Sequence, residues 1–413
     1  MFGRIGFRGY TADDLVEEGA GAITLSPTNI IDGELDFTNC SYLSWNKYYE
    51  SPEIMVKAGD VVLVKTASVG KCALVRSLPK ETTVNPQFLV FKNIVANSAF
   101  FTYILQDYIQ CFLDSEKNGS TIPTISQQII GNFKIMLPPR TEQDSIVRYL
   151  DAATSKIDKA IAMQQKMIDL LNERKQIIIQ NAVTKGLDEN VEMKDSGVEW
   201  IGMIPKHWEI EPFGKHFTFG KGLPITKANL QEEGVAVISY GQVHAKYNLG
   251  TSLTETLVRY VSPKYLETHP QCLLNKNDFI FADTSEDVEG SGNFAFNDYK
   301  DKIFAGYHTV VARPKDLIYP KYYAYLFKSR AWKSQIQSLV NGVKVYSIGK
   351  RILKTSTLLI PSESEQKEIV KVLDLKTAAI EKSIENISRQ ITLLQERKQI
   401  IINEVVTGKV KVS

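Results

Sequence analysis

The chain contains a long internal repeat. Residues 142–184 and 365–407 align without a gap at an offset of 223 positions, and 22 of the 43 aligned positions are identical. The agreement is strongest between LLNERKQIIIQNAVT, from Leu170, and LLQERKQIIINEVVT, from Leu393. Farther upstream the similarity weakens and needs gaps. Such a repeat means that one structural unit has been built twice. The chain is therefore a tandem duplication, and each half has a variable segment followed by a well-matched one.

The well-matched segments predict two long helices with matching apolar seams. Alternating spacings of four and three residues run through Ile157, Ile161, Gln164, Ile168, Leu171, Lys175 and Ile178, and again through Ile380, Ile384, Ile387, Ile391, Leu394, Lys398 and Ile401. This is the pattern of a coiled-coil seam. Prolines ahead of each helix and glycines near each end mark its limits. We expect helices of about 40 residues, ~60 Å long, that pack on each other in antiparallel fashion. The alternative is that each helix independently covers its own sheet.

The variable segments predict mixed α and β structure, so the fold class is α+β. Short β-rich runs lie at 22–25, 61–64, 88–91, 235–239, 279–281 and 309–311, and helix patterns lie at 97–114 and 320–335. The expected organisation is a first mixed domain at 1–137, a first long helix at 138–186, a loop-like linker at 187–204, a second mixed domain at 205–360, and a second long helix with its tail at 361–413.

Composition and motifs argue against an enzyme. The 413 residues, 43% hydrophobic and 23% charged, suit two or three globular domains. Four scattered cysteines and the lack of a long apolar run favour the reducing cytoplasm over secretion or a membrane. No metal-ligand spacing, phosphate loop, dinucleotide fingerprint or hydrolase elbow occurs in the sequence. We therefore expect no catalytic residues, no metal site and no cofactor in this chain. An acidic cluster at 283–289 could suggest a nuclease metal site, but a solvated loop is the favoured interpretation.

Charge is unevenly distributed. The formal net charge is only +2, and residues 196–360 alone are clearly basic, with 20 basic and 15 acidic groups. A protein that relied on phosphate neutralisation for all of its DNA affinity would be more basic than this. If the chain binds DNA, a partner would have to supply much of the backbone contact.

Two junctions resemble those of type I restriction-modification specificity (S) subunits. DSGVEWIG at 195–202, continuing as IPKHWE at 204–209, resembles the start of a target-recognition domain. LPP with EQ at 137–143 and IP with EQ at 360–366 each lead into a long helix that carries ERKQ and ends in VTKGL or VTGK, as in that family. The resemblance covers nearly the whole chain. The first copy lacks the IPxxW segment before Phe2, about 20 residues of the pattern. An N-terminus that begins late is therefore expected, and that domain's initial strand is in question.

The resemblance implies a non-catalytic subunit with two target-recognition domains, separated by an antiparallel coiled coil in a pseudo-twofold tandem repeat. Each domain would read one half of a bipartite site in double-stranded DNA. The helix pair would set the spacer and dock two methyltransferase (M) subunits of an adenine-DNA methyltransferase, which use S-adenosylmethionine. Restriction (R) subunits, which use ATP and Mg, could join the complex.

Polar residues that follow predicted strands are the candidate DNA-binding residues, because donors and acceptors in such loops can meet base edges or phosphates. In the first domain they are Arg4, Arg8, Tyr10, Thr11, Ser26, Asn29, Lys65, Thr66, Ser68 and Lys71. In the second they are Lys221, Tyr240, Gln242, His244, Thr284, Ser285, Lys344 and Tyr346. Any one of them could instead be an ordinary surface or turn residue. The candidate partner-binding residues are Arg174, Lys175, Arg397 and Lys398, which could alternatively form ion pairs within their own helix or simply be solvated flanks of the seam.

Two other classes of protein are alternatives. A coiled-coil scaffold or adaptor without sequence-specific DNA binding would not need two divergent folded domains. A stand-alone enzyme is disfavoured by the motif search. The DNA target, the spacer length and the presence of a restriction subunit do not follow from the sequence.

Overall fold

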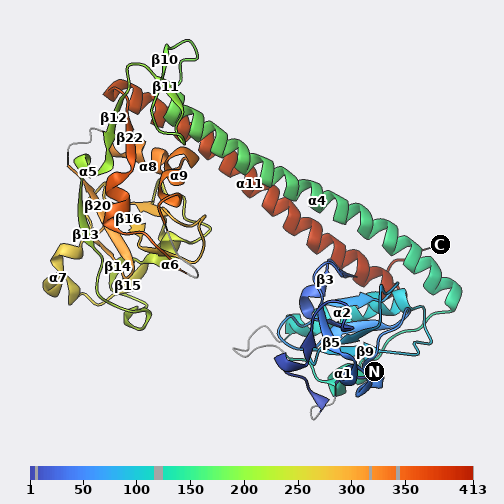
Figure 1. Ribbon diagram of the computed structural model, residues 1–413. Coiled ribbons are helices and arrows are strands. Elements are labelled where there is room, and N and C mark those ends of the chain that lie inside the picture. The colour runs from blue at the N-terminus through green and yellow to red at the C-terminus, as the bar shows by residue number, and fades with distance from the viewer. Residues whose placement is uncertain (5–7, 116–123, 316–318, 341–344, 413) are drawn as a thin grey trace. The chain divides into compact units, whose positions relative to one another are not determined.

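The computed structural model describes residues 1–4, 8–115, 124–315, 319–340 and 345–412 (Figure 1). The chain forms two compact units. Met1–Gln165 with Ser388–Ser413 make the first unit, and Lys166–Ile387 make the second. Each unit is a mixed α/β domain together with parts of two long helices, α4 (Arg140–Lys185) and α11 (Glu363–Val406). The α+β fold class predicted from the sequence is confirmed.

The first domain is built on two small sheets. In one, β2 (Gly21–Leu25) lies between antiparallel β5 (Ser41–Ser44) and parallel β8 (Thr82–Val84), with β1 (Leu15–Val16) beyond β5. In the other, β6 (Val61–Val64) lies between antiparallel β7 (Cys72–Leu74) and β9 (Phe88–Phe91). Every residue of β2, β6 and β9 is buried, which explains their continuous apolar sequences. A ribbon of β3 (Ile30–Ile31) and β4 (Glu34–Leu35) and helices α1 (Trp45–Tyr49), α2 (Ser98–Ser115) and α3 (Gln127–Gly131) complete the domain.

The second domain repeats this topology. Here β14 (Val235–Ile238) lies between antiparallel β15 (Arg259–Val261) and parallel β19 (Ile303–Ala305). Likewise β16 (Phe279–Ala282) lies between antiparallel β18 (Phe294–Phe296) and β20 (Thr309–Pro314), and β13 (Phe217–Lys221) pairs with the far side of β20. The six β runs expected from the sequence are therefore strands.

Short elements complete the second domain. They are α5 (Phe213–His216), α6 (Tyr240–Val243), α7 (Tyr265–Thr268), α8 (Pro320–Lys328), α9 (Arg330–Gln337), α10 (Lys350–Thr355) and the paired strands β17 (Thr284–Ser285) and β21 (Tyr346–Ser347). Two further strand pairs are β10 (Met193–Asp195) with β11 (Met203–Pro205), and β12 (Glu209–Pro212) with β22 (Thr357–Ile360).

Two details of the predicted elements were wrong. The helix expected at 320–335 is two helices, because the chain breaks at Ser329, whose hydroxyl accepts a hydrogen bond from the Trp332 amide (3.3 Å) and so caps α9. The segment expected to be a loop-like linker contains the β10–β11 hairpin. The helix expected at 97–114 is present as α2, shifted by one residue.

The long helices begin and end where their sequence signals indicate. α4 starts directly after Pro139, and α11 starts after Pro361 and Ser362. The Ser362 backbone amide donates to the Glu365 carboxylate (3.1 Å), and the Glu365 amide donates to the Ser362 hydroxyl (3.4 Å), which together form a capping box. Glycines with positive φ, Gly186 and Gly408, follow the C-terminal ends. All fourteen predicted seam positions are buried or half-buried.

In the first unit the helices pack against each other in antiparallel directions (Figure 1). Lys398 is ion-paired with Asp158 (2.7 Å), and six residues farther along α4, Gln164 donates to Gln390 (3.1 Å). The partner number on α11 thus falls as the number on α4 rises.

The second unit repeats an interhelical ion pair. The Lys175 ammonium lies 3.6 Å from the Glu381 carboxylate. Lys175 is equivalent to Lys398 in the repeat, and Glu381 is equivalent to Asp158. The same pair therefore occurs once in each unit, with its two residues exchanged between the helices. The alternative, that each helix covers only its own sheet, is wrong.

Each domain packs on the start of one helix and the end of the other. In the first unit, Phe100 and Ile104 of α2 share a core with Ile146 and Leu150 of α4 and Ile402 of α11. In the second unit, α8 shares a core with residues 179–183 of α4 and 369–373 of α11. Both units are therefore closed by segments from distant parts of the sequence.

Hydropathy gives no sign of a membrane span. None of the described helices is both long and apolar enough to cross a bilayer.

Candidate nucleic-acid interface

Equivalent strand ends in the two domains have the same backbone hydrogen bonds. After β6, the Lys65 amide donates to the Gln87 carbonyl (2.8 Å), and after β16 the Asp283 amide donates to the His308 carbonyl (3.1 Å). The Lys65 carbonyl then accepts from the Ile125 amide (2.9 Å), and the Asp283 carbonyl accepts from the amide of Ile348 (2.7 Å), which is the equivalent of Ile125 in the repeat. Lys65 and Asp283 thus occupy the same backbone position with side chains of opposite charge.

The loops after β2 and β14 also correspond. Ser26 and Ser239 each open a short turn in which the side chain three residues later, Asn29 or Gln242, accepts from the serine backbone amide (2.8 and 3.1 Å). These loops lie at the same end of their domains as Lys65 and Asp283. The reason is that β8 and β19 run parallel to β2 and β14, and the strands that follow them, β9 and β20, start beside these loops. We call Ser26, Asn29, Lys65, Thr66 and Gln87 the first loop cluster, and Ser239, Gln242, Asp283, Thr284 and His308 the second loop cluster.

The second loop cluster is held together by side-chain contacts. The His308 ring lies 3.3 Å from the Asp283 carboxylate, and its centroid lies 5.4 Å from that of Tyr240 in an edge-to-face arrangement. His244 Nε2 lies 2.8 Å from the Thr284 carbonyl oxygen. Three loops that are far apart in sequence therefore meet at one place.

A hollow of about 800 Å³ lies beside this cluster. Its lining includes Tyr240, His244, Thr284, Ser285, Asn293, His308 and Lys333. The Lys333 ammonium donates to the Asn293 side-chain carbonyl (2.5 Å), and the Asn293 amide lies 3.1 Å from His244 Nδ1. Burial lowers the pKa of Lys333, while the negative charge of Asp287 opposes that shift. The hollow thus presents both donors and acceptors from side chains fixed by neighbours.

Several candidates in the first domain are held by the protein itself. The Asn29 amide donates to the Asp36 and Asn39 carbonyls (3.1 and 3.0 Å), and the Lys71 ammonium donates to the Pro27 and Ile30 carbonyls (3.1 and 3.2 Å). Such bonds shape the loops, and they leave these donors less able to meet a ligand.

The candidates near the N-terminus form a separate group. Arg4 is buried, donates to the Arg8 and Val84 carbonyls, and lies over the Tyr10 ring (5.2 Å to the centroid). Arg8 itself is 3.5 Å from Glu53. Burial lowers the pKa of Arg4, although nearby Tyr10 and Glu53 oppose the shift.

The structure brings six of the second-domain candidates to the hollow or its rim. Tyr240, His244, Thr284 and Ser285 line it, Gln242 lies on the same short helix as Tyr240, and Tyr346 of β21 pairs with Ser285. Lys221 lies at the end of β13, exposed, opposite Val310. In the first domain Lys65 and Thr66 share a strand end, and Ser68 and Thr11 are exposed. Lys344 lies outside the described residues.

The partner-binding candidates divide into two kinds. Lys175 and Lys398 lie in the seam and pair with acids of the opposite helix, rather than within their own helix. Arg174 and Arg397 are exposed on the outside of the helices. A partner that docks on the helix pair would therefore meet the two arginines before the two lysines.

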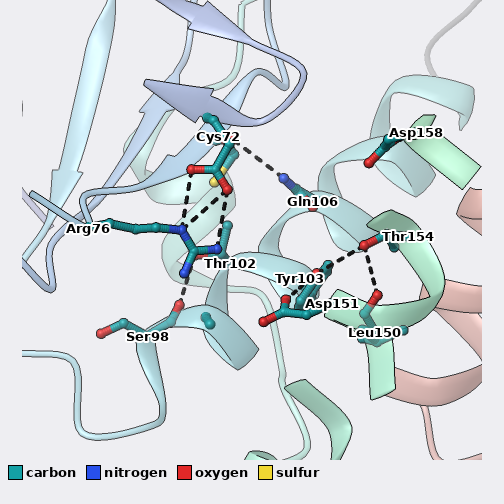
Figure 2. A network of polar contacts seen from close by, with 12 residues as sticks. Cys72, Arg76, Ser98, Thr102, Tyr103, Gln106, Leu150, Asp151, Thr154 and Asp158 are labelled. Carbon is teal, nitrogen blue, oxygen red and sulfur yellow. Dashed lines mark hydrogen bonds and ion pairs between the residues drawn. The ribbon is translucent and has the colours of Figure 1, made fainter. Parts of the chain in front are cut away.

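A repeated polar clamp joins each domain to its following helix. The Tyr103 hydroxyl donates to Asp151 (2.7 Å) and lies 3.4 Å from the Thr154 hydroxyl, as Figure 2 shows. In the second unit Tyr325 contacts Asp374 (2.6 Å) and Thr377 (3.4 Å) in the same way. Burial is the largest cause that raises the pKa of both tyrosines, so both hydroxyls stay protonated and donate.

Comparison with known proteins agrees with this duplicated architecture. The type I restriction modification DNA specificity domain family matches residues 29–167 and 205–391, one match for each half. The chain belongs to this family. The two specificity domains correspond to the two halves of the internal repeat.

Relatives of similar length support the assignment. The chain is 26% identical to the type I restriction enzyme MjaVIII specificity subunit of Methanocaldococcus jannaschii over 368 residues, 87% of this chain and 81% of that protein. It is 25% identical to the putative MjaX specificity subunit of the same organism over 396 residues, 93% and 86% of the two chains. A chain from a solved structure of type I R-M complex assembly and conformational transition has the same fold, with a TM-score of 0.64 at 16% identity over 93% of this chain and 91% of that one.

Sequence reasoning missed several residues of the loop clusters and of the hollow beside the second one. Gln87, His308, Asn293 and Lys333 are not among the predicted residues, and the sequence favours a solvated acidic loop for Asp283. Gln87 and His308 precede a strand, whereas the predicted residues were expected in loops that follow one. The signal that could have found them is the repeat itself, since Lys65 and Asp283 follow the matching motifs Gly59–Val62 and Asn277–Ile280.

Proposed function

We propose that this chain is the non-catalytic DNA-sequence specificity subunit of a type I restriction-modification complex, in which each specificity domain reads one half of a bipartite DNA target. The observation that carries this proposal is the pair of loop clusters. They have one backbone frame and different side chains, which is what two readers of unlike half-sites require. Duplex DNA has an approximate twofold axis, so two similar domains suit two half-sites in successive grooves.

The helix pair is proposed to set the spacer between the half-sites and to dock two methyltransferase subunits. The support is the repeated ion pair and the repeated clamp, which give each unit the same helix surface. A partner that binds one of these surfaces can bind the other in the same way. The near-neutral charge of the chain also favours an assembly in which partners contribute phosphate contacts.

The chemistry is assigned to the partners. The methyltransferase subunits would bind S-adenosylmethionine and methylate adenine, and restriction subunits, where present, would use ATP and Mg. The complex would act in the cytoplasm, on the chromosome. Nothing in the described part of the chain favours the alternative, a coiled-coil scaffold without sequence-specific DNA readout.

One experiment tests the proposal directly. The chain is co-expressed with its methyltransferase in a methylation-deficient host, and modified bases are mapped by genome sequencing. We expect modified adenines in a single two-part motif with a fixed gap. Two results together would contradict the proposal. They are a host genome with no modification above background, and a purified complex that selects no two-part motif from random duplexes.

A further inference from the structure

One residue position links the two sheets of each domain. Lys71 directly precedes β7, and its carbonyl accepts a hydrogen bond from the Val64 amide (2.8 Å) at the end of β6. Asn293 directly precedes β18, and its carbonyl accepts from the Ala282 amide (3.2 Å) at the end of β16. Since β6 and β16 are equivalent strands, Lys71 and Asn293 occupy the same backbone position.

In the first domain, the side chain at this position holds the turn after β2. The Lys71 ammonium donates to the carbonyls of Pro27 and Ile30 (3.1 and 3.2 Å). Both carbonyls belong to the turn that Ser26 opens in the first loop cluster. A lysine bound to two carbonyls of one turn limits how far that turn can move.

In the second domain, the side chain at this position is part of a relay of hydrogen bonds. The Lys333 ammonium of α9 donates to the side-chain carbonyl of Asn293 (2.5 Å). The side-chain amide of Asn293 lies 3.1 Å from His244 Nδ1, and His244 Nε2 lies 2.8 Å from the Thr284 carbonyl oxygen. An ammonium only donates and a backbone carbonyl only accepts, so both ends of the relay are fixed. The Asn293 amide therefore donates to Nδ1, and Nε2 carries the proton that is donated to Thr284.

The relay holds two loops of the second loop cluster together. His244 directly follows α6, the short helix after β14, and Thr284 lies in β17, after β16. The imidazole is closely packed, because a Cβ placed on Gly290 would lie 3.3 Å from His244 Cε1 and closer still to the Ser285 hydroxyl oxygen. Both ring nitrogens of His244 face partners within the protein. The ring therefore acts on the loops rather than on a base edge.

We propose that Lys71 and Asn293 are positioning residues for DNA readout, each of which holds the loop cluster of its own domain in the shape that meets the bases without itself contacting a base. Lys333 and His244 act in the same way, through Asn293. Because this role rests on the proposed function, it requires one half-site for each domain. Loss of a positioning residue displaces a whole cluster, so several base positions of one half-site should lose selectivity together.

Selection from random bipartite duplexes, by the full chain in complex with its methyltransferase, tests both positions. We expect Lys71→Met to lower base preference by about tenfold at two or more positions of one half-site, and Asn293→Leu to do so in the other half-site. Lys71→Arg and Asn293→Asp keep the hydrogen-bonding groups and should retain the preference of the unchanged chain. Lys80→Met, at an exposed position of the first domain, is the matched control and should alter neither half-site.

The salt dependence of DNA binding separates a positioning lysine from a phosphate contact. A lysine that binds a phosphate contributes ~1 to the slope of the logarithm of the binding constant against the logarithm of salt concentration. We expect Lys71→Met to leave that slope unchanged. A slope smaller by about one, with base preference intact, would show that Lys71 binds a phosphate and would overturn its positioning role. Loss of preference at a single base position would overturn that role in favour of a direct base contact.

The protonation of the His244 ring tests the relay without DNA. The full chain is labelled with nitrogen-15 histidine, and NMR spectra are recorded at about pH 8, where an imidazole is ordinarily neutral. We expect the His244 proton on Nε2, with the signal assigned by its loss in His244→Asn. A proton on Nδ1 would overturn the relay.

The selection experiment also separates this inference from the proposed function. An unchanged complex that selects no two-part motif would contradict the specificity role itself. A complex that selects a motif, but whose preferences are the same in Lys71→Met and Asn293→Leu, would overturn the positioning role alone.

Discussion

Lys65 and Asp283 show how one backbone frame can present opposite chemistry. Their amides and carbonyls make the same hydrogen bonds, but one side chain only donates and the other, when ionised, only accepts. In the major groove, an ammonium matches the acceptors O6 and N7 of guanine, while a carboxylate matches the amino group of cytosine. The two positions are therefore expected to discriminate between bases of different kinds.

Single substitutions at these positions should alter one half-site each. We expect Lys65→Gln to relax base preference in one half of the target, and Asp283→Asn in the other, each by about tenfold, because one base-edge contact is lost. Selection from random bipartite duplexes by the methyltransferase complex measures both halves together. Glu232→Gln, at an exposed position of the second domain, serves as the control. A change in both halves from either substitution would contradict this assignment.

Asp278 should give the second unit a dependence on pH. Burial raises its pKa to about 6, although the Asn275 amide and Arg313, 3.3 Å away, favour the charged form. Because an unfolded aspartate titrates near ~4, the folded state binds an extra proton between about pH 4 and pH 6. The free energy of unfolding should therefore fall as the pH rises through this window, by up to roughly 3 kcal/mol.

Denaturant unfolding followed by tryptophan fluorescence checks this slope. Asp278→Asn should flatten it between pH 4 and 6, while Asp301→Asn, at an exposed position, should not. Equal slopes in the two variants would show that another group causes the dependence.

At the scale of elements, the tyrosine clamps are expected to contribute equally. Tyr103→Phe and Tyr325→Phe each remove a hydroxyl that donates to a carboxylate, so each should lower the free energy of unfolding by about 2 kcal/mol. The two clamps lie in different units, so the double variant should show the sum. Tyr247→Phe, at an exposed site, is the control, and chemical denaturation gives the values. A strongly non-additive double variant would contradict the independence of the clamps.

The length of the helix pair should control the recognised spacer. Removing residues 162–168 from α4 and 387–393 from α11 deletes seven facing residues from each, and keeps both interhelical ion pairs in register. Seven residues correspond to ~10 Å of helix, or about three base pairs at ~3.4 Å each. We expect the gap in the methylated motif to shorten by about that amount. Removing either segment alone should abolish modification instead, and an unchanged gap in the double deletion would refute the role of the helices.

The sequence predicted elements better than sites, for a physical reason. The seam of α4 and α11 could be predicted because burial repeats with the helix period, and the strand runs because both of their faces are buried. Position-specific contacts could not. The break at Ser329 depends on a single capping hydroxyl, and the contact of Lys398 with Asp158 joins residues that neither periodicity nor spacing relates. Candidate donors such as Lys71 and Asn29 bind carbonyls of their own domain, which a sequence pattern does not show.

At the scale of the whole molecule, the charge balance predicts how DNA affinity is shared. With a net charge of +2, the isolated chain should bind duplex DNA weakly and with a shallow salt dependence. Adding the methyltransferase should raise the affinity for DNA. It should also make the logarithm of the binding constant fall more steeply with the logarithm of the salt concentration. Anisotropy of a labelled duplex across a range of KCl concentrations measures this. A steep slope for the chain alone would contradict the division of contacts.

The closure of each unit by distant helix segments also matters for synthesis. The core that contains Phe100 and Ile146 is completed by Ile402, so the first domain cannot finish folding until Ile402 has been translated and has left the ribosome. A prematurely terminated product would expose that apolar surface to proteases and chaperones. The first domain of an incomplete chain would therefore be removed before it could occupy DNA.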